Sequence, residues 1–156
     1  MTKIMFVCHG NICRSPMAEF IMKKLVREAG MEKDFLILSS ATSTEEIGNP
    51  VYPPARAELK RHGLSCDGKF AVQLKKSDYE KYDLFLVMDS NNMRNIARIF
   101  PDDPEHKIHK LLEYAGRNDD VDDPWYTRQF NVAYEDIYEG CQGLFNHLTT
   151  SPDRQE

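Results

Sequence analysis

A cysteine and an arginine near the amino terminus have the spacing of a phosphate-binding loop that carries a nucleophile. Cys8 and Arg14 are separated by five residues, and Ser15 and Pro16 follow directly. The apolar run that ends at Cys8 predicts a buried strand, so the chain passes from a strand into a helix at this loop. Such a turn aims several backbone N–H groups at one point, where the positive end of the helix dipole attracts an anion.

Side chains in the loop strengthen this anion site. The Arg14 guanidinium matches two phosphate oxygens, and the positive field favours the thiolate of Cys8, the form that attacks phosphorus. Gly10 and Asn11 tolerate the left-handed backbone that such a loop requires. We expect Ser15 to cap the helix and to place its hydroxyl on the Cys8 sulfur. The phosphate-binding residues predicted here are His9, Gly10, Asn11, Ile12, Cys13, Arg14 and Ser15.

A phosphatase built on this loop also needs an acid, because the departing oxygen is a poor leaving group without a proton. The sequence offers Asp123, which precedes Pro124, Trp125 and Tyr126 in an acidic loop. Pro124 stiffens the backbone there, and a phosphate dianion beside Asp123 would hold its carboxyl group in the protonated form. Trp125 and Tyr126 offer a flat wall for a substrate ring. An ordinary acidic turn stays the alternative, because Asp-Pro pairs are common in turns.

The sequence contains four cysteines, Cys8, Cys13, Cys66 and Cys141. Without an export signal they are expected to be reduced thiols rather than a disulfide framework. Cys66 and Cys141 fit the role of small buried side chains. Cys13 is either a partner for a protective disulfide with Cys8 under oxidation or a small residue whose N–H lines the loop. No metal site is expected, because the cysteines and histidines do not form two matched pairs of ligands.

The length and charge of the chain limit its partners. At 156 residues it is long enough for one domain with a single core. Its 20 basic and 25 acidic residues give a net charge of −5, with no excess that favours nucleic acid or an anionic membrane. The apolar run near the amino terminus is too short for a signal peptide or a membrane span. We therefore expect one domain over residues 1–150, a polar tail over residues 151–156, a monomer and a cytoplasmic location.

Alternating apolar runs and helical patterns predict a doubly wound α/β sheet. Apolar runs typical of strands buried on both faces occupy Ile4–Val7, Phe35–Leu38 and Leu84–Met88, and a weaker run lies near Ile108–Leu112. Helical spacing predicts helices over residues 16–29, 54–61, 90–96 and 129–148, with Pro16 in the first turn and Gly30 and Gly63 as stops. Ligands of such sheets bind beyond the carboxyl ends of the strands, where the Cys8 loop lies.

With these residues assembled, the chain resembles the low-molecular-weight protein tyrosine phosphatase family over nearly its full length. The resemblance rests on Val-Cys-x-Gly-Asn-x-Cys-Arg-Ser-Pro near the amino terminus and on Asp-Pro-aromatic-Tyr late in the chain. It implies a four-stranded parallel sheet flanked by helices on both faces, no metal or cofactor, and phosphotyrosine-containing proteins or small aryl phosphates as substrates. The catalytic residues it implies are Cys8, Arg14 and Asp123, and the substrate-binding residues are Glu46, Trp125 and Tyr126.

Two departures from the family pattern concern the substrate and the support of the loop. Relatives that look like protein-arginine phosphatases carry a threonine at the position of Ile12, and the bulkier isoleucine, which has no hydroxyl, favours phosphotyrosine. Around Lys69 nothing matches a histidine that supports the loop in some members, so we expect different hydrogen bonds there. Thioredoxin-coupled arsenate reduction is a weaker alternative, because a closely spaced pair of extra cysteines is missing. A phosphopeptide-binding module would need neither Cys8 as a thiolate nor Asp123.

Overall fold

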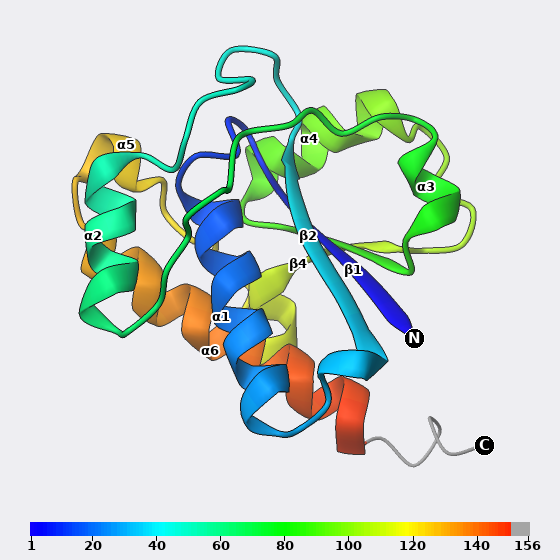
Figure 1. The fold of residues 1–156 in the computed structure, drawn as a ribbon. Coiled ribbons are helices and arrows are strands. Elements are labelled where there is room, and N and C mark those ends of the chain that lie inside the picture. The colour runs from blue at the N-terminus through cyan, green and yellow to red at the C-terminus, as the bar shows by residue number, and fades with distance from the viewer. Residues whose placement is uncertain (151–156) are drawn as a thin grey trace.

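The structure is a computed structural model that describes residues 1–150, so the predicted tail over residues 151–156 lies outside the described residues. Its centre is a four-stranded, fully parallel sheet with the strand order β2-β1-β3-β4 (Figure 1). The strands are β1 (Thr2–Cys8), β2 (Phe35–Ala41), β3 (Leu84–Val87) and β4 (Ile108–Lys110). This arrangement confirms the predicted doubly wound α/β fold.

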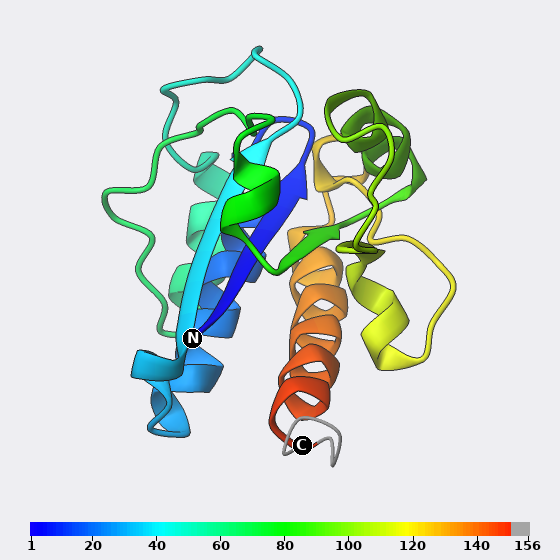
Figure 2. The same ribbon diagram turned by 90° about the vertical axis from the view of Figure 1, so that its right-hand side faces the viewer.

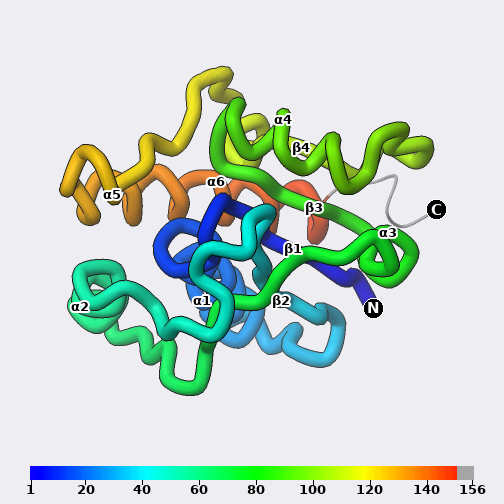
Figure 3. The backbone as a smooth tube through the Cα atoms, turned by 90° about the horizontal axis from the view of Figure 1, so that it is seen from above, coloured from blue at the N-terminus to red at the C-terminus, as the bar shows by residue number. Residues whose placement is uncertain are grey.

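Helices connect the strands and cover both faces of the sheet (Figures 2 and 3). The α-helices are α1 (Arg14–Glu28), α2 (Pro53–Arg61), α3 (Asp78–Lys81), α4 (Ser90–Ile99), α5 (Pro124–Thr127) and α6 (Phe130–Thr150). Two short 3-10 helices are η1 (Glu32–Asp34) and η2 (Leu111–Ala115). No helix within residues 1–150 is long and apolar enough to cross a membrane.

The central strand β1 separates two hydrophobic cores. Ile4 and Phe6 belong to the larger core, which α1 and α6 cover, whereas Met5 and Val7 belong to a smaller core with residues of α4. This alternation follows from the two-residue period of a strand, which sends successive side chains to opposite faces. Strand β1 is therefore buried on both faces, as the unbroken apolar run predicts.

The prediction of burial on both faces is wrong for β2. Leu36 and Leu38 are each 37% exposed, while Phe35 and Ile37 between them are buried in the larger core. Strand β2 lies at the edge of the sheet, and the smaller core contains no β2 residue. An apolar run therefore identifies the strand, but its place in the sheet decides how much of it is covered.

Every predicted strand and helix is present, but β2 and α4 run past their predicted ends, to Ala41 and Ile99, and other bounds differ as well. The fourth strand ends at Lys110, because Leu111 and Leu112 turn inward in η2 and are buried there. Helix α1 starts at Arg14 rather than at Pro16. The short helices α3 and α5 were not expected, because single turns carry no periodic apolar pattern. The predicted stops at Gly30 and Gly63 are confirmed by φ values of 70° and 76°.

Candidate active site

The Cys8 loop joins the end of β1 to the start of α1 and is fixed to its neighbours by its carbonyl groups. The carbonyls of Cys8 and His9 accept hydrogen bonds from the backbone N–H groups of Thr42 and Ser43, at 3.0 and 3.1 Å. The carbonyl of Ile12 accepts from the N–H of Tyr52 at 2.8 Å. Because these carbonyls bond outward to other segments, the loop can direct N–H groups toward its centre.

Asn11 holds the loop in its left-handed turn. Its φ is 60°, and its side chain is buried. The side-chain oxygen of Asn11 accepts from the N–H of Val72 at 3.1 Å, which fixes the orientation of the amide. Its Nδ2 then donates to Ser15 Oγ at 2.7 Å and to Ser39 Oγ at 3.0 Å. The expectation of a left-handed residue is thus correct for Asn11.

Gly10 meets a different requirement from the one predicted. It has no positive φ, but a Cβ built on it would lie 3.3 Å from Cγ of Glu46. The glycine therefore gives Glu46 space above the loop rather than conformational freedom. Next to it, His9 Nε2 lies 3.0 Å from Oε2 of Glu45 at an exposed position.

The Cys8 sulfur has two hydrogen-bonding neighbours inside the loop. The backbone N–H of Asn11 donates to Sγ at 3.3 Å, and Ser15 Oγ lies 3.0 Å from the same sulfur. Because the Ser15 hydroxyl accepts from Asn11, its own proton is available for the sulfur. The predicted contact between Ser15 and Cys8 is therefore present. The predicted helix cap is not, because the N-cap residue is Cys13 and it makes no side-chain capping bond.

A second set of polar groups, which begins at Ser39, supports the side chain of Asn11. Ser39 Oγ donates to Glu19 at 2.5 Å, and Lys69 Nζ donates to the carbonyl of Ser39 at 2.8 Å. Lys69 also lies 3.7 Å from the buried Glu19 carboxylate. Burial lowers the pKa of Lys69, and the charge of Glu19 opposes that shift. A lysine thus takes part in the support of the loop, at a place where the missing histidine led us to expect only that the hydrogen bonds would differ.

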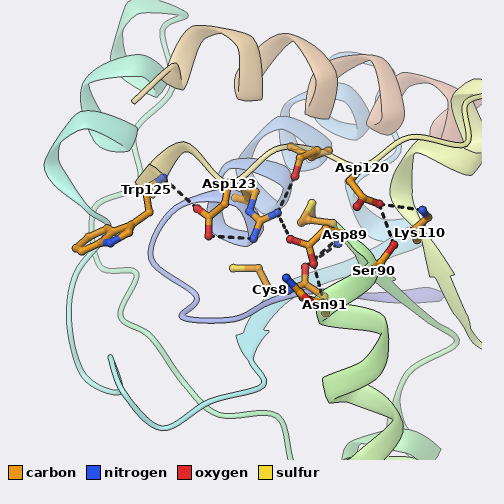
Figure 4. Close-up of polar contacts among 12 residues, drawn as sticks. Cys8, Asp89, Ser90, Asn91, Lys110, Asp120, Asp123 and Trp125 are labelled. Carbon is orange, nitrogen blue, oxygen red and sulfur yellow. Dashed lines mark hydrogen bonds and ion pairs between the residues drawn. The ribbon is translucent and has the colours of Figure 1, made fainter. Parts of the chain in front are cut away.

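Arg14 is almost fully buried beneath the loop, and three groups orient it. Its Nη1 donates to Oδ2 of Asp89 and to the carbonyl of Val121, both at 2.7 Å, and its Nη2 lies 3.5 Å from Oδ2 of Asp123. Figure 4 shows the carboxylates of Asp89 and Asp123 directed toward the same space above Cys8. Burial alone lowers the pKa of Arg14, but the negative groups of Cys8, Asp89 and Asp123 outweigh it and raise that pKa. The guanidinium is charged and held in one orientation.

Both carboxylates also cap helices, which fixes their positions. Asp89 is the N-cap of α4 and forms a capping box with Asn92. Asp123 is the N-cap of α5, where its Oδ1 accepts from the N–H of Trp125 at 3.0 Å. Its side chain is 30% exposed and faces the cavity that Cys8 lines. A carboxyl group in this place can exchange protons with a bound molecule.

All of the predicted site residues except Asn11 and Ser15 line one cavity of about 170 Å³, and those two contact the Cys8 sulfur within the loop instead. Its lining residues are Cys8, His9, Gly10, Ile12, Cys13, Arg14, Glu45, Glu46, Asp123, Trp125 and Tyr126. Trp125 is half-exposed and packs on Tyr52 with the ring centroids 4.8 Å apart, while Tyr126 is 80% exposed. Arg128 donates to the Tyr52 hydroxyl at 3.0 Å and thereby joins the Asp123 loop to the start of α2. The cavity has an aromatic rim and a polar, cationic floor.

The four cysteines are free and buried. Cys13 lines the cavity together with Cys8, and burial, followed by the charges of Cys8 and Asp123, raises the pKa of its thiol. Cys66 and Cys141 are buried in the larger core, as predicted, and burial raises the pKa of both thiols. No group of three His, Cys, Asp or Glu side chains within residues 1–150 is placed to hold a metal ion.

Several residues of the site were not identified from the sequence. Asp89 orients Arg14, Glu19 and Ser39 support Asn11, and Tyr52 supports Trp125. Asp89 could have been found, because it lies just beyond β3, the strand that pairs with β1. Adjacent parallel strands bring their carboxyl ends to the same edge, so polar residues there become neighbours. The same signal marks Ser39, which lies near the carboxyl end of β2, the other strand that pairs with β1, but no comparable signal marks Glu19 or Tyr52.

Comparison with known proteins agrees with this geometry. The family model described as low molecular weight phosphotyrosine protein phosphatase matches residues 3–154. The chain belongs to this family. The low molecular weight protein-tyrosine-phosphatase YfkJ of Bacillus subtilis (strain 168) is 36% identical over 146 residues, which are 92% of this chain and 94% of YfkJ.

Solved structures of other phosphatases share the whole fold. SP-PTP of Streptococcus pyogenes has a TM-score of 0.85 at 36% identity, and the match covers 99% of this chain and 97% of that one. DARP, a drosophila arginine phosphatase, has a TM-score of 0.86 at 30% identity and covers 96% of this chain and 99% of its own. The chain is thus a member of a hydrolase family, with the fold that the sequence predicts.

Proposed function

We propose that the chain hydrolyses protein phosphotyrosine through a phosphocysteine formed on Cys8. The observation that carries the proposal is the convergence of Cys8, Arg14 and Asp123 on one small cavity. A nucleophile, an anion-binding cation and a proton donor are the groups that this reaction needs. A phosphopeptide-binding module would not need a carboxyl group and a thiol directed into the same space.

In the first step the phosphate enters the loop, and Arg14 and the loop N–H groups hold its non-bridging oxygens. The Cys8 thiolate forms a bond to phosphorus while the bond from phosphorus to the tyrosine oxygen breaks. Asp123 gives its proton to that oxygen, so that tyrosine leaves as a neutral phenol. Arg14 is oriented by Asp89 and Val121 before the substrate arrives, which lowers the cost of organising charge in the transition state.

In the second step water attacks the phosphocysteine. Asp123, now ionised, takes a proton from the water while the new bond from oxygen to phosphorus forms and the bond from sulfur to phosphorus breaks. The Ser15 hydroxyl, which lies 3.0 Å from Sγ, stabilises the departing thiolate by a hydrogen bond. Inorganic phosphate leaves, and the enzyme returns to its starting form.

The rim of the cavity supports an aromatic substrate. Trp125 and Tyr126 supply flat surfaces for the phenyl ring, and Glu46 contacts the substrate at the other side of the mouth. Cleavage of p-nitrophenyl phosphate by the wild type and its loss in Cys8→Ser test the enzyme class. Cleavage that survives in Cys8→Ser would overturn the mechanism.

Protein-arginine phosphatase activity is the second candidate, because the related DARP is named an arginine phosphatase. The apolar Ile12 side chain lines the cavity here and offers no hydroxyl to a guanidinium. We expect higher kcat/KM for a phosphotyrosine peptide than for the matched phosphoarginine peptide, and we expect Ile12→Thr to shift the ratio toward phosphoarginine. Faster cleavage of phosphoarginine by the wild type would reverse the assignment.

The remaining predictions from the sequence concern arsenate reduction, the oligomeric state and the location of the protein. We infer that arsenate reduction is absent, because Cys13 is the only other cysteine that lines the cavity within residues 1–150. Arsenate-dependent oxidation of thioredoxin would contradict this. A monomeric state and a cytoplasmic location stay predictions from the sequence.

A further inference from the structure

A second, larger hollow adjoins the active-site cavity. It has a volume of about 530 Å³, and we call it the α2 groove. Its lining residues are Ile12, Glu46, Asn49, Pro50, Val51, Tyr52, Pro53, Arg56, Ala57 and Lys60. Ile12 and Glu46 line the active-site cavity as well, so the two spaces adjoin at these residues. The hydrogen bond from the N–H of Tyr52 to the carbonyl of Ile12 joins the α2 end of the groove to the phosphate loop.

One face of α2 forms a wall of the groove. The residues of this face recur at helical spacing and are exposed: Pro53, Arg56, Ala57 and Lys60. On the opposite face Ala55 and Leu59 are buried in the larger core. Figures 1 and 3 show α2 beside α5, the helix that follows the proposed acid. The groove is therefore an open surface next to the site and not a gap in the core.

The charges in the groove are mostly positive, although the whole chain has a net charge of −5. Arg56 and Lys60 are its two cations, and Glu46 is its one acidic residue among residues 1–150. Arg56 forms an ion pair with Asp67 at 2.6 Å, but both side chains are more than half exposed. Such exposed pairs contribute little stability and exchange partners easily. Lys60 forms no ion pair with any described residue.

We propose that the α2 groove binds the part of the substrate polypeptide that flanks the phosphotyrosine, with an acidic side chain on Arg56 and Lys60. This inference rests on the proposed function, because it requires a phosphotyrosine in the neighbouring cavity. The groove is apolar along Pro50 and Val51, which suits the backbone and apolar side chains of a peptide. The cations lie one and two helical turns beyond Tyr52, so they contact a residue at a distance from the phosphate rather than the phosphate itself.

The mouth between the two spaces makes the preference more specific. Glu46 lies there, because it lines both spaces, and its Oε1 accepts from Asn49 at 2.9 Å, which holds the carboxylate beside the path of the peptide. A substrate residue passing this point would be repelled if it were acidic. The structure therefore favours a peptide that is neutral or basic next to the phosphotyrosine and acidic farther along on one side.

The test compares phosphotyrosine peptides that differ only in one flanking position, which is Glu in one peptide and Lys in the other. The position is moved stepwise along both sides of the phosphotyrosine. The readout is the ratio of kcat/KM for the Glu and Lys peptides, in which a general change of catalytic power cancels. Lys60→Glu reverses the charge in the groove, and Lys33→Glu makes the same change of net charge on the exposed η1 segment, which precedes β2 at the opposite end of the sheet.

We expect the wild type to prefer the Glu peptide at distal positions on one side, by about threefold to fivefold for exposed charges. Lys60→Glu should abolish or invert this preference, and Lys33→Glu should retain it. High salt should weaken it, because exposed charges are screened. Equal ratios at every position, or the same loss in both variants, would overturn the inference while the proposed function stands. Failure of the wild type to cleave any peptide would instead overturn the proposed function.

Discussion

Arg14 and Asp89 form a buried ion pair across the carboxyl edge of the sheet. The guanidinium Nη1 and the carboxylate Oδ2 are 2.7 Å apart, although the residues are 75 positions apart in the chain. The two side chains are 3% and 14% exposed. Removal of one partner from such a pair leaves the other charged and uncompensated. Asp89 is therefore a positioning residue for the cation that we expect to bind the phosphate.

Asp89→Asn tests this role without loss of the helix cap. Asparagine caps helices as well as aspartate does, so α4 should stay intact, but the charge opposite Arg14 is lost. We expect kcat/KM for p-nitrophenyl phosphate to fall by about tenfold to 100-fold, and the melting temperature to fall as well, because the buried Arg14 charge loses its partner. Full activity in Asp89→Asn, together with a lower melting temperature in Asp89→Ala, would show that the residue acts only as a cap.

Asp123→Asn separates proton transfer from the structural role of the same side chain. An amide oxygen can still accept from the N–H of Trp125 and cap α5, but the group can no longer give a proton to the substrate. For a phenyl phosphate with a poor leaving group we expect turnover to fall by about 100-fold or more. The fall should be much smaller for p-nitrophenyl phosphate, because that phenolate leaves more easily. Equal losses for both esters would remove Asp123 from the role of acid.

Alkylation distinguishes Cys8 from the other three cysteines. Burial raises the pKa of the thiols of Cys13, Cys66 and Cys141, so little thiolate forms there near neutral pH. Cys8 lies against the N–H of Asn11 and the Ser15 hydroxyl. We expect iodoacetamide to modify Cys8 before the other three cysteines. Mass spectrometry identifies the modified residue.

Inorganic phosphate provides the control for this experiment, because it should occupy the loop and protect Cys8. The proposed anion site would be contradicted if Cys66 reacted before Cys8, or if phosphate did not slow the modification of Cys8.

Glu58 makes the stability of the fold depend on acid pH. Its side chain is 5% exposed and lies 2.6 Å from Arg61 and 3.0 Å from His62. Burial alone would raise the pKa of Glu58, but the hydrogen bonds of Arg61 and His62 outweigh it, and the pKa lies below its usual value of 4.5. A lowered pKa means that the stabilisation is present above about pH 4.5 and is lost as the pH falls through the value of the folded protein.

Glu58→Gln should therefore lower the free energy of unfolding by about 1–3 kcal/mol at pH 7, and the difference from the wild type should shrink below about pH 4. Urea unfolding at several pH values measures this, with the exposed Glu28→Gln as the matched control. A difference that stays constant down to pH 3 would mean that the carboxylate charge is not the cause.

The contact between α6 and η2 has no space for a side chain at Gly143. A Cβ on this residue would lie 2.1 Å from the carbonyl oxygen of Tyr114 and 2.7 Å from its carbonyl carbon. Backbone atoms cannot move away as a flexible side chain can. We expect Gly143→Ala to cost about 2–4 kcal/mol in the free energy of unfolding. The neighbouring exposed Gln142→Ala should cost almost nothing, and equal midpoints of urea unfolding would show that η2 does not pack closely on α6.

The sequence by itself determines those parts of the site in which the reactive residue and the strand, loop or helix that positions it are neighbours in the chain. The spacing from Cys8 to Arg14 sets up a strand, a loop and a helix within a few residues, and Asp123 is held by the cap that it forms itself. The alternation of apolar runs and helical stripes also determines the parallel sheet, because each element needs a partner for its apolar face. These features depend on local backbone geometry and on the period of the apolar residues, and both can be read from one segment at a time.

Only the tertiary structure decides which distant groups meet. Asp89 faces Arg14, Ser39 faces Asn11, and Tyr52 packs on Trp125 because parallel strands bring their loops to one edge. The exposure of Leu36 and Leu38 likewise follows from the place of β2 at the edge of the sheet. The pattern of a segment specifies which of its faces is apolar, whereas the neighbour that covers that face, or leaves it open, is set by the packing of the whole chain.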